Sequence, residues 1–223
     1  MTLTLYTLDW VPDFPRGFVR DLRVRWALEE IGQPYETATV PSRPKSDTHL
    51  DMQPFGQVPI IRDGDLTLFE SGAILQHVAR GPALSPADRR AAIRPWPSAA
   101  LNTVEMATMH WQVMLLGQKF PDFFGPPPSG DVIDHAFAFA KTRLDAIEKR
   151  MATRDWIAGA FSIADIAMVD TLRNVASEGG LADHGALSAY LDRATARPAF
   201  ERAMRDHMAH WQAADAARET ETA

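Results

Sequence analysis

The sequence predicts two domains, an α/β domain followed by an all-helical domain. Strand signals occur only in the first eighty residues, in the order β-α-β and then β-β-α. After Gly81 every hydrophobic repeat has the helical period, and proline or glycine separates the segments. Residues 81–86 have the composition of a linker. We therefore expect domains at residues 1–80 and 87–215.

The first part of the α/β domain reads as a strand, a helix and a second strand. Residues 3–8 alternate between leucine and polar side chains, which predicts a strand. A helix is expected from about residue 17 to 31, and a strand at residues 35–40. The helix has two apolar stripes, so we expect it to be buried on two sides, between the sheet and the second domain. The stripes are Phe18, Leu22 and Trp26, and Val24, Leu28 and Ile31.

A hairpin and a helix complete this domain. The Asp63-Gly64 pair is typical of the two central positions of a hairpin turn, so residues 58–62 and 66–69 are expected to pair as antiparallel strands. A helical period follows, with Ser71 as the expected N-cap. The Glu70-Ser71 pair then lies at a helix N-terminus, whose backbone N–H groups and dipole favour a carboxylate.

Val58 and Pro59 stand at the head of the first hairpin strand. Proline cannot donate to a sheet ladder, which leaves the backbone of Val58 able to pair with an extended ligand. With the helix N-terminus at Ser71, this arrangement would hold both ends of a small peptide. Taken alone, the Val58-Pro59 pair is also typical of a sheet edge or turn without any binding role.

The second half of the chain reads as helices, with a loop at residues 126–130 and a polar end, about ten residues long, that is expected to fray. Ser162 and Asp165 have the spacing of a capping box, which predicts a helix start and no chemistry. The expected helices cover about 87–118, 131–152, 162–177, 186–196 and 198–212.

Composition excludes several classes of function. The formal net charge of -6 and the lack of a basic stripe argue against a nucleic-acid partner. No apolar run is long enough to span a membrane, and we expect a cytoplasmic protein. The chain has no cysteine, so thiol chemistry would need the sulfur of a ligand. His207 and His210 are spaced like a metal pair but have no third ligand in view; we expect surface histidines and no metal site.

Four short segments, in this order along nearly the whole chain, resemble the cytosolic glutathione transferase superfamily. They are Gln53-Pro54-Phe55-Gly56-Gln57-Val58-Pro59, Glu70-Ser71-Gly72-Ala73-Ile74, Phe161-Ser162-Ile163-Ala164-Asp165-Ile166 and Ala196-Arg197-Pro198-Ala199-Phe200. The resemblance implies a thioredoxin-like first domain with a cis bond before Pro59. It also implies a homodimer, glutathione bound in the first domain, and a role in detoxification.

The resemblance assigns glutathione contacts residue by residue. It implies that the Val58 backbone pairs with the cysteinyl backbone of glutathione. Glu70 would contact the amino group of the γ-glutamyl end, and Ser71 its carboxylate. Gln57 is a further expected side-chain contact. For the glycine carboxylate, Lys45 and His49 both remain candidates.

The sequence departs from the family at the thiol. Many members place Ser, Cys or Tyr after the first strand, and the corresponding position here is Phe18, which has no donor. Tyr6 is expected to be a core residue. The helix N-terminus around Phe18, with Arg16 and Arg20, is expected to stabilise the thiolate instead. The alternative interpretation makes both arginines surface charges or salt-bridge partners.

The second substrate is expected over the sulfur, against the first helix of the second domain. Its pocket would be apolar and flexible, with His110 as its one polar member. The same methionine stripe is also typical of a helix-bundle core. The candidate lining residues are Trp10, Phe14, Met106, Met109, His110, Met114 and Phe120.

The predicted function is conjugation of glutathione to a small hydrophobic electrophile. Peroxide reduction with glutathione needs the same thiolate and remains an alternative. Phe18 favours a second alternative, a non-catalytic module that serves binding or assembly, whereas Val58, Pro59, Glu70 and Ser71 favour the enzyme.

Overall fold

The computed structural model describes the backbone of residues 2–222 and the side chains of residues 2–220, and it divides into two compact units. The first unit combines the chain up to residue 88 with the chain from residue 195 onward. The second unit covers residues 89–194. The last helix, α11 (Pro198–Thr222), therefore belongs with the α/β part, whereas the sequence had placed residues 198–212 in the helical domain.

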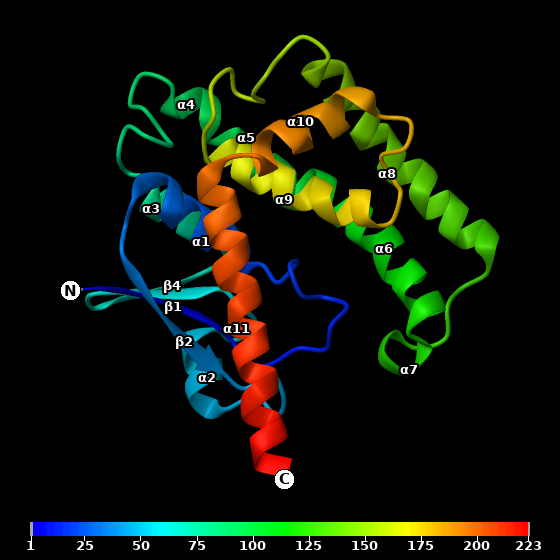
Figure 1. Cartoon of the computed structure of the whole chain (residues 1–223). Coiled ribbons are helices and arrows are strands. Elements are labelled where there is room, and N and C mark those ends of the chain that lie inside the picture. Colours follow the sequence, from blue (N-terminus) through cyan, green and yellow to red (C-terminus); the bar gives the residue numbers. More distant parts are fainter. Residues whose placement is uncertain (1, 223) are drawn as a thin grey trace. The chain divides into compact units, whose positions relative to one another are not determined.

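A four-stranded sheet forms the centre of the first unit (Figure 1), with the order β2-β1-β3-β4. β1 and β2 are parallel, because the helix α1 (Asp21–Ile31) carries the chain back across the sheet. β3 pairs antiparallel with both β1 and β4. The strands are β1 (Leu3–Leu8), β2 (Tyr35–Val40), β3 (Ile60–Asp63) and β4 (Leu66–Phe69). The predicted α/β fold followed by helices is confirmed.

The hairpin turn lies one residue later than predicted. Asp63 pairs with Leu66, so the two central turn residues are Gly64 and Asp65. Gly64 has φ +60°, the conformation that the first central position of a tight hairpin turn requires. The glycine therefore fixes the register of the hairpin.

The core of the first unit lies between the sheet and two helices, α1 and α3 (Ser71–Val78). Its hydrophobic cluster is made of side chains from β1, α1, β3 and α3, namely Leu3, Leu5, Val24, Leu28, Ile61 and Ile74. A further helix, α2 (Asp47–Met52), was missed by the sequence analysis. Six residues give too short a segment for a helical repeat to show.

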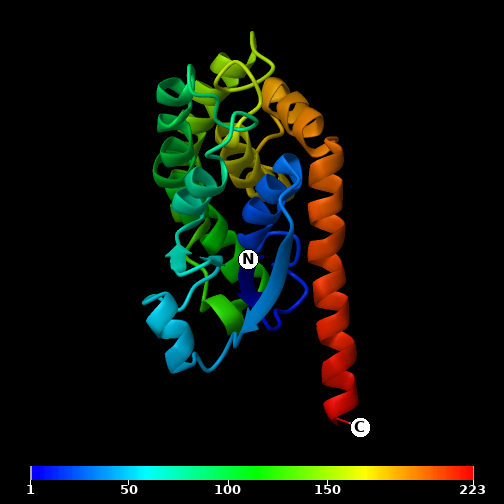
Figure 2. The ribbon, with the colours of Figure 1, turned by 90° about the vertical axis from the view of Figure 1, so that its left-hand side faces the viewer.

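Two helices differ from their predicted bounds. α1 begins at Asp21 and not at residue 17, because Gly17 has φ +82° and interrupts the helical conformation. α11 remains helical through Thr222, where fraying was expected. In both ribbon views α11 runs beside α1 (Figures 1 and 2). Trp26 of α1 packs edge-on against Phe200 with ring centroids 4.9 Å apart. Within the first unit, one predicted stripe of α1 thus faces α11.

The second unit is helical throughout its regular elements. Its capping box is confirmed: Asp165 Oδ2 accepts from the Ser162 N–H at 2.9 Å, and the Ser162 side chain caps α9. In the described part of the chain, no helix is long and apolar enough to cross a membrane. The elements are α4 (Arg90–Ile93), α5 (Pro95–Ala99), a π-helical turn η1 (Ala100–Glu105), α6 (Met106–Lys119), α7 (Pro121–Phe124), α8 (Gly130–Met151), α9 (Ile163–Ser177) and α10 (Gly185–Thr195).

Candidate functional site

The backbone just before β3 lies outside the registered strand pairs of the sheet. The Val58–Pro59 peptide bond is cis, and the registered strand pairs of β3 begin only at Ile60. Val58 is half-buried and lies just outside that register. Because Pro59 has no N–H, the Val58 backbone is the last one before the strand that can pair with an extended ligand.

Glu70 has an unusual backbone conformation at the start of α3. Its φ is +68°, and among the described residues it is the one non-glycine residue with positive φ. The helix begins immediately after it, at Ser71, and the Ile74 N–H donates to the Glu70 carbonyl at 2.9 Å. Glu70 is therefore the N-cap position, and the prediction of Ser71 as N-cap is wrong by one residue. Strain in a non-glycine residue is typical of functional sites.

Ser71 is held by a buried arginine that the sequence analysis did not select. Arg23 Nη1 donates to Ser71 Oγ at 3.3 Å, and Arg23 is only 1% exposed. A hydroxyl that accepts from a guanidinium still has its own proton to donate. Arg23 thus adds a positive charge and fixes the hydroxyl at the N-terminus of α3, where a carboxylate is favoured.

The two candidates for the glycine carboxylate differ in position. His49 is fully buried, and its Nε2 donates to the Gln57 carbonyl at 3.0 Å. It therefore supports the loop before Val58. Lys45 is exposed, and its stem lies so close to Gly56 that a Cβ there would be 3.2 Å from Lys45 Cδ. Partial burial, and then the charge of Arg43, lower the pKa of Lys45.

Residues 9–20, called the 9–20 segment below, connect β1 to α1 without a strand or an α-helix. The segment turns through backbone bonds from the Arg16 N–H to the Asp13 carbonyl at 3.1 Å and from the Phe18 N–H to the Pro15 carbonyl at 2.9 Å. Phe18, at the expected thiol position, is half-buried. Arg20 is the N-cap residue of α1 and is also half-buried.

Arg16 is bound to the last helix. Arg16 Nη1 and Nη2 donate to the two oxygens of the Asp215 carboxylate at 2.6 and 2.7 Å, and the Trp10 indole N–H donates to the same carboxylate at 2.8 Å. These bonds and the Arg16 charge lower the pKa of Asp215 to about 2. The positive charge of Arg16 is therefore balanced within 3 Å, which leaves it less able to stabilise a second anion.

The prediction that His207 and His210 are surface histidines is wrong. His207 is fully buried, and its Nδ1 lies 3.3 Å from Asp21 Oδ2. His210 Nε2 donates to the Leu8 carbonyl at 2.9 Å. The described residues contain no group of three or more His, Cys, Asp or Glu side chains placed to hold a metal ion.

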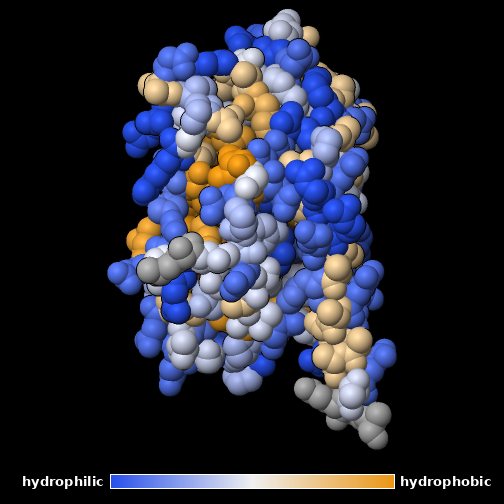
Figure 3. All heavy atoms as spheres, turned by 60° about the vertical axis from the view of Figure 1, so that its left-hand side comes forward, coloured by the Kyte–Doolittle hydropathy of each residue, from blue (hydrophilic) through white to orange (hydrophobic). Residues whose placement is uncertain are grey.

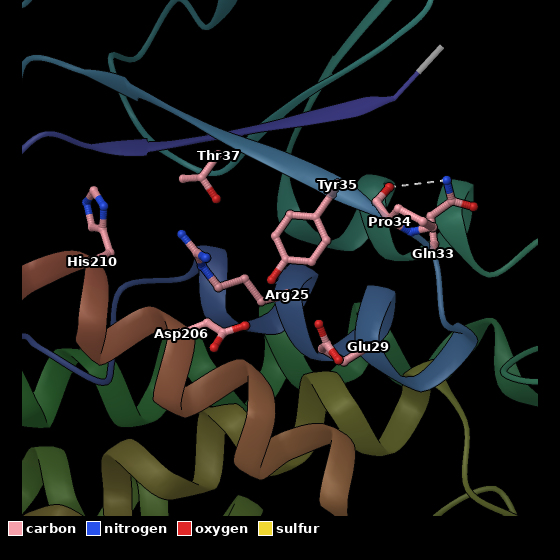
Figure 4. A pocket seen from close by; sticks show the side chains of 8 residues that line it. All are labelled: Arg25, Glu29, Gln33, Pro34, Tyr35, Thr37, Asp206 and His210. Atoms are coloured by element: carbon pink, nitrogen blue, oxygen red, sulfur yellow. Dashed lines mark hydrogen bonds between the residues drawn. The ribbon is translucent and has the colours of Figure 1, made fainter.

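Asp21 is a buried acid at the first turn of α1. Burial raises its pKa, but His207 and then Arg25, whose Nε donates to Asp21 at 2.7 Å, together lower the pKa below its usual value. The carboxylate is thus ionised and paired from two helices. Figure 4 shows Arg25 and His210 among the residues that line a polar pocket of about 430 Å³ between α1, β2 and α11.

An apolar pocket of about 570 Å³ lies in the second unit, between the η1–α6 helix and α8. Met106, His110 and Met114, three of the residues expected at the electrophile site, line this pocket. Met109 is half-buried and is not part of its lining. The pocket also includes residues of the π-helical turn, a distortion that is frequent at functional sites. Phe120, also predicted as a lining residue, is exposed and does not line this pocket. The two remaining predicted residues, Trp10 and Phe14, belong to the first unit.

The residues that the sequence analysis missed, Arg23 and Asp215, carried weak signals. Arg23 stands between Leu22 and Val24, on a helix whose residues 21–28 are all buried, and a buried charge needs a partner. Asp215 continues the face of α11 that includes Ala203, His207 and Trp211, at helical spacing. Following that repeat beyond residue 212 identifies the position.

Comparisons with known proteins agree with the geometry of the first unit. The family described as "Glutathione S-transferase, N-terminal domain" matches residues 14–80. Glutathione S-transferase 4 of Zea mays is 35% identical over 155 residues, which are 65% of this chain and 68% of the relative. Glutathione S-transferase 3 of Zea mays is 31% identical over 195 residues, 81% of this chain and 86% of the relative.

Solved structures show the same fold. The structure of glutathione S-transferase-I bound with lactoylglutathione superposes with a TM-score of 0.74 at 26% identity and covers 92% of this chain and 99% of that one. A glutathione transferase from Burkholderia graminis, with two glutathione molecules bound per subunit, gives a TM-score of 0.75 at 26% identity. That likeness covers 91% of this chain and 87% of the other.

Proposed function

Because this chain belongs to the glutathione transferase superfamily and is a transferase of that family, we propose that its first unit binds glutathione along residues 53–71. The observation that carries the proposal is the pairing of two features, a Val58 backbone that lies outside the strand register before Pro59 and a strained Glu70 at the N-terminus of α3. They supply a backbone edge and a carboxylate site on one short stretch of chain. Two relatives of known structure were solved with lactoylglutathione and with glutathione bound.

Each end of glutathione has a proposed partner. The γ-glutamyl carboxylate is bound by Ser71, with the charge of Arg23 behind it, and the amino group by the exposed carboxylate of Glu70. The Val58 backbone pairs with the cysteinyl residue, and Gln57 adds a side-chain contact. Lys45, which lies against Gly56, binds the glycine carboxylate, while buried His49 holds the Gln57 carbonyl in place.

The thiol is activated at the N-terminus of α1. A free thiol with a pKa near 8.5 is only a few per cent ionised at pH 7, and lowering the pKa by about 2 makes it mostly thiolate. The dipole at the N-terminus of α1, which begins just after Phe18 and Val19, and the charge of Arg20, the N-cap residue, supply this shift. Arg16 contributes less, because its charge is balanced by Asp215.

The reaction is addition of the thiolate to a small hydrophobic electrophile held by Met106, His110 and Met114. With an aryl halide, the sulfur forms a bond to carbon, the carbon–halogen bond breaks, and halide leaves with the electron pair. The thiol proton has already left to solvent. The apolar lining of the pocket and the flexible methionine side chains suit aromatic substrates of varied shape.

A homodimer is also part of the proposal. Phe55 is 71% exposed, and two further hydrophobic side chains of the first unit, Leu50 and Leu66, are exposed as well. Figure 3 shows one face of the molecule, with hydrophobic side chains gathered on its upper half. Exposed patches of this kind mark protein interfaces. Sedimentation should show a dimer, and Phe55→Ser should shift it toward monomer; a monomeric unmodified protein would contradict the dimer.

Retention on immobilised glutathione, followed by turnover assays, tests the function. We expect retention, elution by free glutathione, and turnover of an aryl halide. Failure to bind glutathione would contradict the proposal completely. Turnover of cumene hydroperoxide without turnover of the aryl halide would replace conjugation by peroxide reduction, and binding without any turnover would indicate a non-catalytic module.

A further inference from the structure

We propose that the C-terminal part of α11 positions the 9–20 segment for thiol activation, and that Asp215 is the positioning residue. The inference rests on the proposed function, because thiol activation is assigned to that segment. Asp215 has no proposed contact with glutathione or with the electrophile. It acts through Arg16 and Trp10, which are 199 and 205 residues away in sequence.

Asp215 is joined to the segment by several hydrogen bonds. Its carboxylate accepts two hydrogen bonds from Arg16, at 2.6 and 2.7 Å, in the bidentate geometry of the strongest carboxylate–guanidinium pairs. Arg16 also donates from Nε and Nη2 to the Val11 carbonyl at 3.2 and 3.0 Å. One guanidinium thus links the backbone of the segment directly to α11.

Both ends of the segment are also bound to α11. Just before it, the Leu8 carbonyl accepts from His210 at 2.9 Å. Just after it, Asp21 lies 3.3 Å from His207. Trp10 is bound by Asp215, and its ring lies under Arg218, whose Cζ is 4.3 Å from the ring centroid. α11 therefore contacts the segment itself, at Trp10 and Arg16, and the two residues that flank it, Leu8 and Asp21.

The 9–20 segment needs such external contacts. It contains two prolines and a glycine at φ +82°, and no residue from 10 to 20 lies in a strand or an α-helix. Loops of this kind have few backbone hydrogen bonds of their own and open at low free-energy cost. Since the thiol is expected beside Phe18, a small displacement of the segment changes the distance between the sulfur and the helix N-terminus that ionises it.

The ion pair between Arg16 and Asp215 persists at physiological pH. The pKa of Asp215 is lowered to about 2 by its hydrogen bond from Arg16, then by Trp10, so the carboxylate stays ionised. Asp13 lies 3.0 Å from Arg16 as well, on the same segment. The pair Arg16–Asp215 joins the segment to α11, whereas Arg16–Asp13 is internal to the segment. Loss of Asp215 would therefore remove the bidentate bond between the segment and α11 and leave Arg16 its internal pair with Asp13.

The test compares Asp215→Asn with the unmodified full chain by two measurements. Hydrogen exchange of residues 9–20 should become faster in the variant, because the bidentate bond is lost. The thiolate absorbance of bound glutathione, followed against pH, should show a higher pKa, and kcat should fall about 10-fold, less than the roughly 100-fold cost of a 1 Å misplacement. Affinity for glutathione should stay within about twofold, and Asp215→Glu should restore most of kcat.

A matched control separates positioning from general stability. Arg202 Nε of α11 forms a similarly short ion pair, 2.7 Å, with Glu29, which lies in the last turn of α1, at the opposite end of that helix from the 9–20 segment. Arg202→Met should leave the thiolate pKa unchanged. If Asp215→Asn binds glutathione and shows unaltered hydrogen exchange and an unaltered thiolate pKa, the positioning role of Asp215 is contradicted and the proposed function stands. An unmodified chain that does not bind glutathione would instead contradict the proposed function.

Discussion

The 53–71 stretch and the 9–20 segment contribute to one proposed site but are held in place in different ways. The 53–71 stretch contains a hairpin and a helix start, which its own residues specify, and its outside contacts, from Arg23 and His49, support single positions. The 9–20 segment has no such elements and is fixed by hydrogen bonds to α11, nearly two hundred residues later. The first region binds the ligand through local structure, whereas the second depends on tertiary contacts.

This difference predicts which substitutions should impair glutathione binding and which should impair the chemical step. Local structure of the hairpin type is specified by a few neighbouring residues, so substitutions of its ligand contacts should change ligand affinity and leave the thiolate pKa unchanged. A loop held by distant side chains can be displaced by substitution of any residue that takes part in those contacts. Substitutions of the α11 residues that contact the segment, such as Asp215, should therefore change the chemistry while binding persists.

The largest expected effect is on ligand affinity. Ser71→Ala removes a hydroxyl held by Arg23, and Glu70→Ala removes an exposed carboxylate, so each should weaken glutathione binding about 10- to 100-fold. Titration calorimetry measures the affinity, and the thiolate pKa of saturated protein should not change. Thr67→Ala, an exposed change on the neighbouring strand β4, is the matched control. A changed thiolate pKa with intact affinity would reverse the roles given to the two regions.

A pair of glycines gives the next largest effect. Gly17 in the 9–20 segment and Gly64 in the hairpin both have positive φ, so alanine at either should cost about 1–2 kcal/mol of unfolding free energy. A Cβ at Gly17 would meet Met204 Sδ at 3.8 Å, an ordinary contact, and the backbone thus accounts for the cost. Denaturant unfolding measures it. Gly17→Ala should also lower kcat, and Gly64→Ala should not. Equal kcat in the two variants would contradict the different roles given to the 9–20 segment and the hairpin.

The smallest effect is a pH dependence of stability. The pKa of Asp215 in the folded protein is about 2, below its value in the unfolded chain. A lowered carboxyl pKa gives stability that is present above the unfolded value, near 3.9, and is lost as pH falls toward 2. The difference in unfolding free energy between the unmodified chain and Asp215→Asn should therefore be constant from pH 8 to 5 and shrink below pH 4. A difference that shrinks between pH 7 and 5 would be inconsistent with an ionised, paired Asp215.

The fold was largely predictable because its signals are local. The strands at residues 3–8, 35–40 and 66–69, the later helices and the Ser162–Asp165 capping box follow from hydrophobic repeats and turn residues. The short helix α2 gives no repeat, and the start of α1 depends on the conformation of Gly17. Such features need tertiary structure to be recognised.

The candidate site was predictable to the same extent. Val58, Glu70 and Ser71 follow from short-range patterns and from the family resemblance. The partner of Arg16 does not, because no local rule connects Arg16 with Asp215 or Leu8 with His210. The same reason explains why buried His207 read as a surface residue. Its partner, Asp21, is 186 residues away.

A chain that ends at Gln212 tests the central claim most directly, because it keeps Trp211 and loses Asp215. Glutathione affinity and the turnover of an aryl halide would be measured on the shortened and the full chain side by side. The account predicts that the dissociation constant changes by no more than about twofold while kcat falls by about 10-fold or more. Equal kcat in the two chains, or a loss of affinity as large as the loss of kcat, would contradict it.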